Sequence, residues 1–208
     1  MRGIFIVMEG PDGSGKSTQI EMLREYLDKN GRKSVITREP GGTVISEQIR
    51  KIILDPANKE MSHVTEMLLY AASRAQLMKE VVIPALEDGQ VVISDRFVDS
   101  SMVYQGIARG LGTEIVANVN ALGIGEYKPD RIYYIDISEE EGLRRKKMQK
   151  KLDRLEQENI DFHHMVSEGY RNILKDREEV LRIDGELPAN EIHDMIIRDL
   201  EVLSKREI

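Results

Sequence analysis

The chain has 208 residues, of which 40% are hydrophobic and 32% are charged, and its formal net charge is −7 at pH 7. This composition is typical of an ordinary globular chain, and the acidic balance argues against general binding to nucleic acid. The sequence contains no cysteine, which excludes disulfides and thiolate metal sites, and no apolar run approaches the ~18 residues that a membrane-spanning helix requires. We therefore expect a cytoplasmic protein with neither a secretion signal nor a membrane anchor, folded as a single domain over residues 1–208.

The first predicted strand, at residues 4–8, runs into a glycine-rich segment. Residues 10–18 have the pattern G-x-x-x-x-G-K-[ST], and apolar residues recur at helical spacing between residues 20 and 27. In this pattern the glycines let backbone N–H groups turn toward phosphate oxygens, Lys16 reaches the β- and γ-phosphates, and Ser17 binds Mg²⁺. A merely flexible turn is the alternative, but the flanking strand and helix favour a phosphate site at a helix N-terminus. The predicted nucleotide-binding residues are Gly10, Pro11, Asp12, Gly13, Ser14, Gly15, Lys16, Ser17 and Thr18.

Asp12 is an unexpected residue in a loop that holds anions, because a carboxylate there would repel phosphate. From its spacing alone, two interpretations stay open. Asp12 either points away from the phosphates toward a hydrogen-bond donor, or it only stabilises the turn.

Beyond this loop, predicted strands and helices alternate along the chain. A strand at 34–37 is followed by a loop at 38–43 with one proline and two glycines, and an apolar strand at 91–94 is closed by Asp95 and Arg96. The other predicted elements are helices at about 45–54, 64–86, 100–107, 114–122, 162–174 and 192–203 and strands at 131–137 and 180–183. The alternation predicts an α/β fold with a doubly wound, five-stranded parallel sheet and helices on both faces.

The end of the strand at 91–94 carries two candidate catalytic residues. In open parallel sheets, ligands bind beyond the carboxyl ends of the strands. Asp95 stands where P-loop enzymes place a carboxylate that organises Mg²⁺, and Arg96 offers a fork of donors for phosphate oxygens. A purely structural ion pair is the alternative.

A basic run interrupts the acidic chain between residues 144 and 154. Such a run is typical of a solvated face or a nucleic-acid patch, but a third use is a lid at about 144–156. Cations that close over a phosphoryl group would stabilise its charge and expel water. The run contains Arg144, Arg145, Lys146, Lys147, Lys150, Lys151 and Arg154.

Together these residues resemble the bacterial thymidylate kinases, which form part of the nucleoside monophosphate kinase branch of the P-loop NTPases. The resemblance extends from Ile4 to the last predicted helix. It is carried by the phosphate loop with its internal acid and by the segments at 38–43, 69–74, 95–101, 104–106 and 152–156. It implies a P-loop kinase fold, a homodimer, and transfer of the γ-phosphate of ATP to dTMP, with Mg²⁺ as cofactor and no nucleic acid or membrane as partner.

The resemblance also implies a role for each matching residue around the phosphates. Asp12 would bind the 3′-hydroxyl of the deoxyribose, which supplies the donor that its position calls for. Arg96 and Arg50 would hold the monophosphate, with Arg38 as a third arginine. Asp95 would lie near Mg²⁺ and the transferred phosphate.

For the nucleoside, the resemblance implies a pocket that reads the base. Tyr70 would form the platform under thymine, and Arg74, one helical turn later, would donate to its O4. Ser101 and Gln105 would contact the base edge, and Tyr104 would exclude a ribose 2′-hydroxyl.

The lid is where this chain departs from part of the family. Some members have an arginine in the phosphate loop at the position of Gly13, and members without it place catalytic arginines in the lid. The corresponding lid positions here are Arg145, Lys147 and Gln149. We expect Arg145 and Lys147 to act with Lys16, Asp95 and Arg96 as the catalytic residues, although a lysine lacks the two-pronged geometry of an arginine.

Three other functions remain as alternatives. Another P-loop kinase acting on a nucleoside or a different monophosphate is the nearest, and Arg50 and Arg96 favour an acceptor that already carries phosphate. A GTP switch would need Asn-Lys-x-Asp, whereas residues 58–61 read Asn-Lys-Glu-Met. A nucleic-acid-dependent ATPase would depend on the basic run alone.

Overall fold

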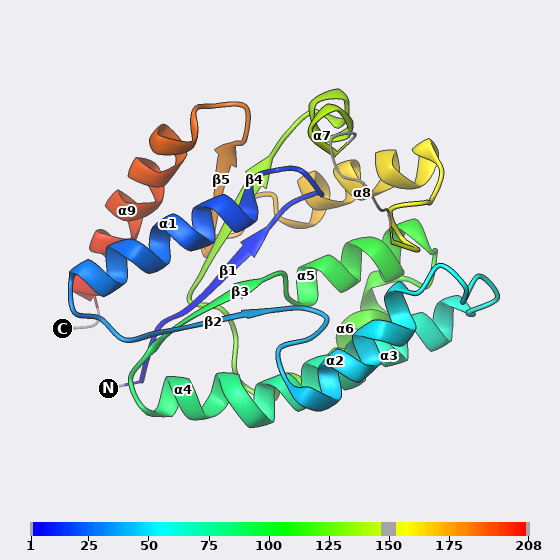
Figure 1. Ribbon diagram of the computed structural model, residues 1–208, viewed down its shortest axis with the longest axis horizontal. Coiled ribbons are helices and arrows are strands. Elements are labelled where there is room, and N and C mark those ends of the chain that lie inside the picture. Colours follow the sequence, from blue (N-terminus) through cyan, green and yellow to red (C-terminus); the bar gives the residue numbers. More distant parts are fainter. Residues whose placement is uncertain (1, 147–152, 207–208) are drawn as a thin grey trace.

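The computed structural model describes residues 2–146 and 153–206. Within these ranges, the centre of the molecule is a five-stranded parallel sheet with the strand order β2-β3-β1-β4-β5 (Figure 1). The strands are β1 (Phe5–Glu9), β2 (Ser34–Arg38), β3 (Val91–Asp95), β4 (Arg131–Asp136) and β5 (Val180–Asp184). The predicted α/β class and doubly wound parallel sheet are therefore confirmed.

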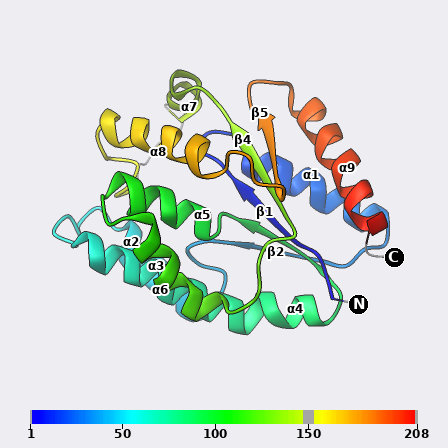
Figure 2. The same ribbon diagram turned by 180° about the vertical axis from the view of Figure 1, so that it is seen from behind.

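Helices cover both faces of the sheet (Figures 1 and 2). On one face lie α1 (Lys16–Lys29) and α9 (Ala189–Arg206), which pack against each other. The other elements are α2 (Val44–Leu54), α3 (His63–Leu77), η1 (Met78–Val82), α4 (Ile83–Glu87), α5 (Val98–Ser101), η2 (Met102–Ala108), α6 (Thr113–Ile124), α7 (Glu139–Lys146) and α8 (Ile160–Ile173). No helix in the described part of the chain is long and apolar enough to cross a membrane.

The strand β1 shows why the sheet is buried on both sides. Its alternate side chains point to opposite faces: Ile6 and Met8 join the core under α1 and α9, and Phe5 and Val7 join the core under η1 and α4. Both faces need apolar side chains, so the strand is a continuous hydrophobic run, as expected for a parallel sheet.

Two helices are wound differently from the prediction. The predicted helix at 64–86 is α3 and α4 joined by the π-helical turn η1, and the predicted helix at 100–107 is α5 followed by the π-helical segment η2. A π-helical turn has i→i+5 hydrogen bonds and occurs mostly at functional sites. The segment η2 carries Tyr104 and Gln105, two of the residues predicted to contact the nucleoside.

The register of the sheet brings three polar strand ends together. Asp95 pairs with Met8 of β1 on one side and with Arg38 of β2 on the other, and Glu9 follows Met8 directly. Because the strands are parallel, these carboxyl ends form one edge.

Candidate active site

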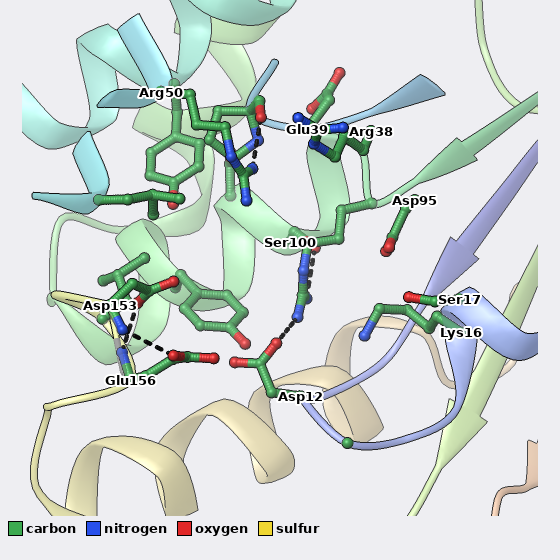
Figure 3. A pocket seen from close by; sticks show the side chains of 18 of the residues that line it. Asp12, Lys16, Ser17, Arg38, Glu39, Arg50, Asp95, Ser100, Asp153 and Glu156 are labelled. Atoms are coloured by element: carbon green, nitrogen blue, oxygen red, sulfur yellow. Dashed lines mark hydrogen bonds and ion pairs between the residues drawn. The ribbon is translucent and has the colours of Figure 1, made fainter. Parts of the chain in front are cut away.

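A cavity of about 510 Å³ lies at this edge and unites the predicted motifs (Figure 3). The predicted site residues that line it are Asp12, Gly13, Gly15, Lys16, Ser17, Thr18, Arg38, Arg50, Tyr70, Arg74, Asp95, Arg96, Ser101, Tyr104, Gln105 and Arg145. Gly10, Pro11 and Ser14 complete the phosphate loop but do not line the cavity. Lys147 lies outside the described residues, as do Gln149 and much of the predicted lid.

The phosphate loop is held by Lys16. Its buried Nζ donates to the carbonyl oxygens of Gly10 at 2.8 Å and Pro11 at 3.0 Å. Gly10 has a φ of +142°, and a Cβ there would stand 2.4 Å from the carbonyl oxygen of Ile135. Burial, and then the charge of Arg96, lower the pKa of Lys16 to about 8. The loop therefore places a desolvated cation at the start of α1.

Asp95 provides a carboxylate suited to a metal ion. Its Oδ1 is buried and has no hydrogen-bond partner, and the side chain lies in the cavity facing the side on which Ser17 and Lys16 stand (Figure 3). No group of three or more His, Cys, Asp or Glu side chains within the described ranges could hold a metal. This donor set fits Mg²⁺, which is bound by one or two protein ligands together with waters and substrate phosphates.

Arg96 is held from several sides. Its Nη2 donates to Asp12 Oδ1 at 2.6 Å, and its Nη1 donates to the Gly10 carbonyl at 3.0 Å and to the Tyr170 hydroxyl at 2.9 Å. The residue has a φ of +74°, which costs a non-glycine residue about 1 kcal/mol or more. The surrounding contacts thus fix one orientation of the guanidinium at the cavity wall.

The other end of the cavity is formed by α3 and η2. Arg74 is buried, and its guanidinium donates to Glu39, Asn120, the Phe97 carbonyl and Ser101. Arg74 therefore has a structural role in addition to the predicted base contact.

The remaining predicted nucleoside residues gather at the same end. Tyr70, Tyr104 and Gln105 line the cavity beside Arg74, and Tyr104 lies under the guanidinium of Arg96. The residues predicted to bind phosphate and those predicted to bind the base thus line one cavity.

Comparison with known proteins identifies the relatives of this site. A family model described as thymidylate kinase matches residues 8–196. The chain belongs to the thymidylate kinase family. It is 50% identical over 202 residues to the thymidylate kinase of Caldanaerobacter subterraneus subsp. tengcongensis, which covers 97% of this chain and 96% of that protein. The thymidylate kinase of Clostridium novyi is 46% identical over 198 residues, which cover 94% of this chain and 97% of that one.

A solved thymidylate kinase structure also resembles this fold. The crystal structure of thymidylate kinase from Ehrlichia chaffeensis matches with a TM-score of 0.77 at 29% identity, over 96% of this chain and 99% of that chain. The resemblance inferred from the sequence is confirmed.

Of the two cations predicted to act from the lid, Arg145 lies within the described residues. Its Nη1 donates to the Gly13 carbonyl at 3.3 Å and its Nη2 to the Gly185 carbonyl at 3.1 Å. Gly13 has a φ of +81°, and a Cβ there would lie 2.9 Å from the Gly142 carbonyl oxygen in α7. An arginine at this position would be strained, so the geometry favours a cation supplied from the α7 side of the loop.

Several cavity residues had no predicted role. The loop after β2 and the end of the predicted lid, at 153–156, belong to family motifs, but the following side chains have no assigned role. They include Glu39, which accepts from Arg74, and Asp153 and Glu156, which are hydrogen-bonded to each other (Figure 3). The unassigned lining residues are Glu39, Pro40, Leu54, Ser100, Asp153, Leu155 and Glu156.

Glu9 is a further residue of this thymidylate kinase site that has no role assigned from the sequence. It is fully buried under Arg96, and its Oε2 accepts from the Ser100 hydroxyl at 2.6 Å and the Tyr170 hydroxyl at 3.1 Å. Burial, and then the charge of Asp99, raise its pKa to about 7. The sequence contains a signal for this role, because Glu9 ends an apolar strand as Asp95 does.

This raised pKa predicts a pH dependence of stability. The unfolded chain releases the Glu9 proton near pH 4.5, whereas the folded protein keeps it to about pH 7. The folded state binds more protons between these values, so the Glu9 contribution is present below about pH 4.5 and is lost as the pH rises through 7. The unfolding midpoint of the native chain, measured relative to that of Glu9→Gln, is therefore expected to fall between pH 5 and pH 8. A difference that stays constant across this range in calorimetry would contradict the assignment.

Proposed function

We propose that the protein transfers the γ-phosphate of ATP to dTMP, giving dTDP and ADP, as a step in dTTP synthesis. One observation carries the proposal: the phosphate loop and the ring-binding end of α3 and η2 line the same cavity. A donor phosphate on the loop and an acceptor nucleotide beside Arg96 would then meet within one cavity.

The chemistry is an in-line transfer. An oxygen of the acceptor phosphate attacks the γ-phosphorus while the bond to the β-phosphate oxygen breaks, and the charge moves onto the leaving ADP. Lys16 and Arg145 stabilise the donor side, and Arg96 and Arg50, with Arg38, offset the repulsion between the two anions. The acceptor phosphate is already nucleophilic, so positioning is sufficient and no strong base is required.

The proposal assigns the metal and the nucleoside contacts as follows. Ser17 and Asp95 would hold Mg²⁺, which when bound neutralises charge on the β- and γ-phosphate oxygens. Tyr70 supports the thymine ring, Arg74, Ser101 and Gln105 contact its edge, and Tyr104 excludes a ribose 2′-hydroxyl. From the composition, we still expect the protein to be cytoplasmic.

The decisive experiment is a panel of acceptors in one ATP-consuming assay. dTMP is expected to give the highest kcat/KM among the common nucleoside monophosphates, with no turnover of nucleosides. Preferred turnover of a nucleoside or of a different monophosphate would replace dTMP kinase by another P-loop kinase.

Replacement of Asp12 by alanine tests the sugar contact. Loss of a hydrogen bond to a charged group is expected to raise the KM for dTMP by roughly 10- to 150-fold. Asp12→Ala also removes the ion pair with Arg96, but that loss affects every acceptor equally. The 3′-deoxy analogue of dTMP is therefore the control, and equal losses for both acceptors would refute the hydroxyl contact.

We also propose a homodimer, formed through α2, α3 and α6. The sequence alone offered no surface for it, but these helices lie side by side (Figures 1 and 2). They carry exposed apolar side chains, a feature typical of interaction sites: Val44, Ile45, Ile52, Val64, Leu68, Ile115 and Leu122. Sedimentation equilibrium is expected to give twice the mass of one chain, and Leu68→Glu to give a monomer. A monomeric native chain would exclude the dimer.

A further inference from the structure

Glu66 is a buried carboxylate in α3 that does not line the cavity. Its Oε1 accepts from Gln105 Nε2 at 2.9 Å and from Arg109 Nε at 3.3 Å, and its Oε2 accepts from Arg109 and Arg154. Burial alone would raise the pKa of Glu66, but the hydrogen bonds from Gln105, Arg109 and Arg154 outweigh it and lower the pKa. The side chain is therefore an ionised acceptor.

This contact determines the orientation of the Gln105 amide, that is, which of its two polar atoms faces the cavity. An ionised carboxylate has no proton to donate, so the amide group of Gln105 can face Glu66 only with its nitrogen. The amide oxygen lies on the opposite side of the same carbon. Since Gln105 is buried and lines the cavity, the group that it offers to a ligand is an acceptor.

Arg74 offers the complementary group. A guanidinium has five N–H donors, and four are used: Nε by Glu39, one on Nη1 by Asn120, and both on Nη2, which faces Glu39, the Phe97 carbonyl and Ser101. One Nη1 hydrogen is left. Since Arg74 and Gln105 both line the cavity, this end can offer a ligand one donor and one acceptor.

We propose that Glu66 is a positioning residue which, by orienting the Gln105 amide, makes the site select thymine over cytosine. Thymine has an N3–H donor next to the O4 acceptor, which matches Gln105 and Arg74, whereas cytosine has an N3 acceptor next to a 4-amino donor. Cytosine would leave both protein groups buried and unpaired, and sites built in this way discriminate strongly. The inference rests on the proposed dTMP kinase activity.

A purely structural role for Glu66 makes different predictions. Arg154 also donates to the Ile53 carbonyl at 2.8 Å, and Arg109 pairs with Glu158 at 2.6 Å, so the cluster ties residues 154–158 to α2 and α3. If Glu66 only held this segment, its loss would affect all acceptors alike.

The test compares three variants by kcat/KM for dTMP and dCMP and by the KM for ATP. In Glu66→Gln the residue 66 amide can donate to the Gln105 oxygen and turn it from the cavity. The dTMP-to-dCMP ratio is expected to fall at least about tenfold, through the KM for dTMP, with an unchanged KM for ATP. The exchange Glu66→Gln with Gln105→Glu keeps the charge and again places an acceptor in the cavity, so it is expected to restore most of the ratio. Glu158→Gln, which disturbs Arg109 without contacting Gln105, is the control and is expected to keep the ratio.

An unchanged ratio in Glu66→Gln, or a lost ratio that the exchange does not restore, would overturn the inference. Calorimetric binding of dTMP and dCMP gives the same ratio without turnover, and the exchange variant serves if Glu66→Gln fails to fold. Absence of dTMP turnover in the native chain would instead refute the proposed function, so the two failures are distinguishable.

Discussion

Lys16→Met is expected to lower kcat by on the order of 10³, because it removes a buried cation from the loop that would hold the transferred phosphate. Lys16 Nζ donates to the Gly10 and Pro11 carbonyls, and phosphate oxygens would replace these carbonyls as acceptors. The KM for dTMP should change little, since the proposed acceptor site lies on the other side of the cavity. Steady-state kinetics with both substrates varied measures the two effects separately.

The matched control for this variant is Lys29→Met. Lys29 lies in the last turn of the same helix and is exposed, so its replacement should leave kcat unchanged. A second readout is the pH profile. The pKa of Lys16 is about 8, so the free protein loses this charge above pH 8 and the KM for ATP should rise between pH 7 and 9. A kcat within tenfold of the native value would exclude Lys16 from the reaction.

Arg96→Lys is expected to lower kcat/KM for dTMP by on the order of 10² or more, even though the charge is kept. The two terminal nitrogens of Arg96 bind Asp12 on one side and Gly10 and Tyr170 on the other, and a single ammonium cannot span all three. The loss should concern dTMP, with the KM for ATP nearly unchanged. Initial rates with each substrate varied in turn decide this.

Arg38→Lys is the control for Arg96→Lys. Arg38 also lines the cavity, but its side chain is half exposed and its Nη2 donates to Glu47 at 2.9 Å. Its replacement should cost much less, because an exposed ion pair contributes little. Equal losses of kcat/KM for dTMP in the two variants would mean that Arg38 contributes as much to the phosphate site as Arg96 does.

The strands and most helices of this fold could be predicted because their signals are local. An apolar run of strand length such as 91–94, or helical spacing such as that between residues 20 and 27, is a property of consecutive residues. The winding of η1 and η2 could not be predicted, since the same apolar spacing fits an ordinary helix. Pro84, just after η1, removes one donor from the helix, but a proline alone does not specify a wider turn.

The candidate site divides in the same way. Lys16, Ser17 and Asp95 belong to local patterns with a known chemistry, and the structure brings them to one cavity. Glu9 and Glu66 were missed because their importance depends on partners far along the chain. Glu9 meets Tyr170, 161 positions away, and Glu66 meets Gln105, 39 positions away. The position of Glu9 at the end of an apolar strand marks it as a candidate, but no pattern of neighbouring residues identifies its partner or that of Glu66.

The hydroxyl of Tyr170 has a consequence for the order in which the protein becomes competent during synthesis. It binds both Glu9 and Arg96, so the residues around Arg96 include one from the first strand and one from the last fifth of the chain. Contacts this distant in sequence form late, because the intervening chain must first be ordered. A nascent chain that has emerged only as far as β4 therefore contains the whole phosphate loop but lacks the hydroxyl that positions Arg96, and competence for transfer follows only after α8 has docked.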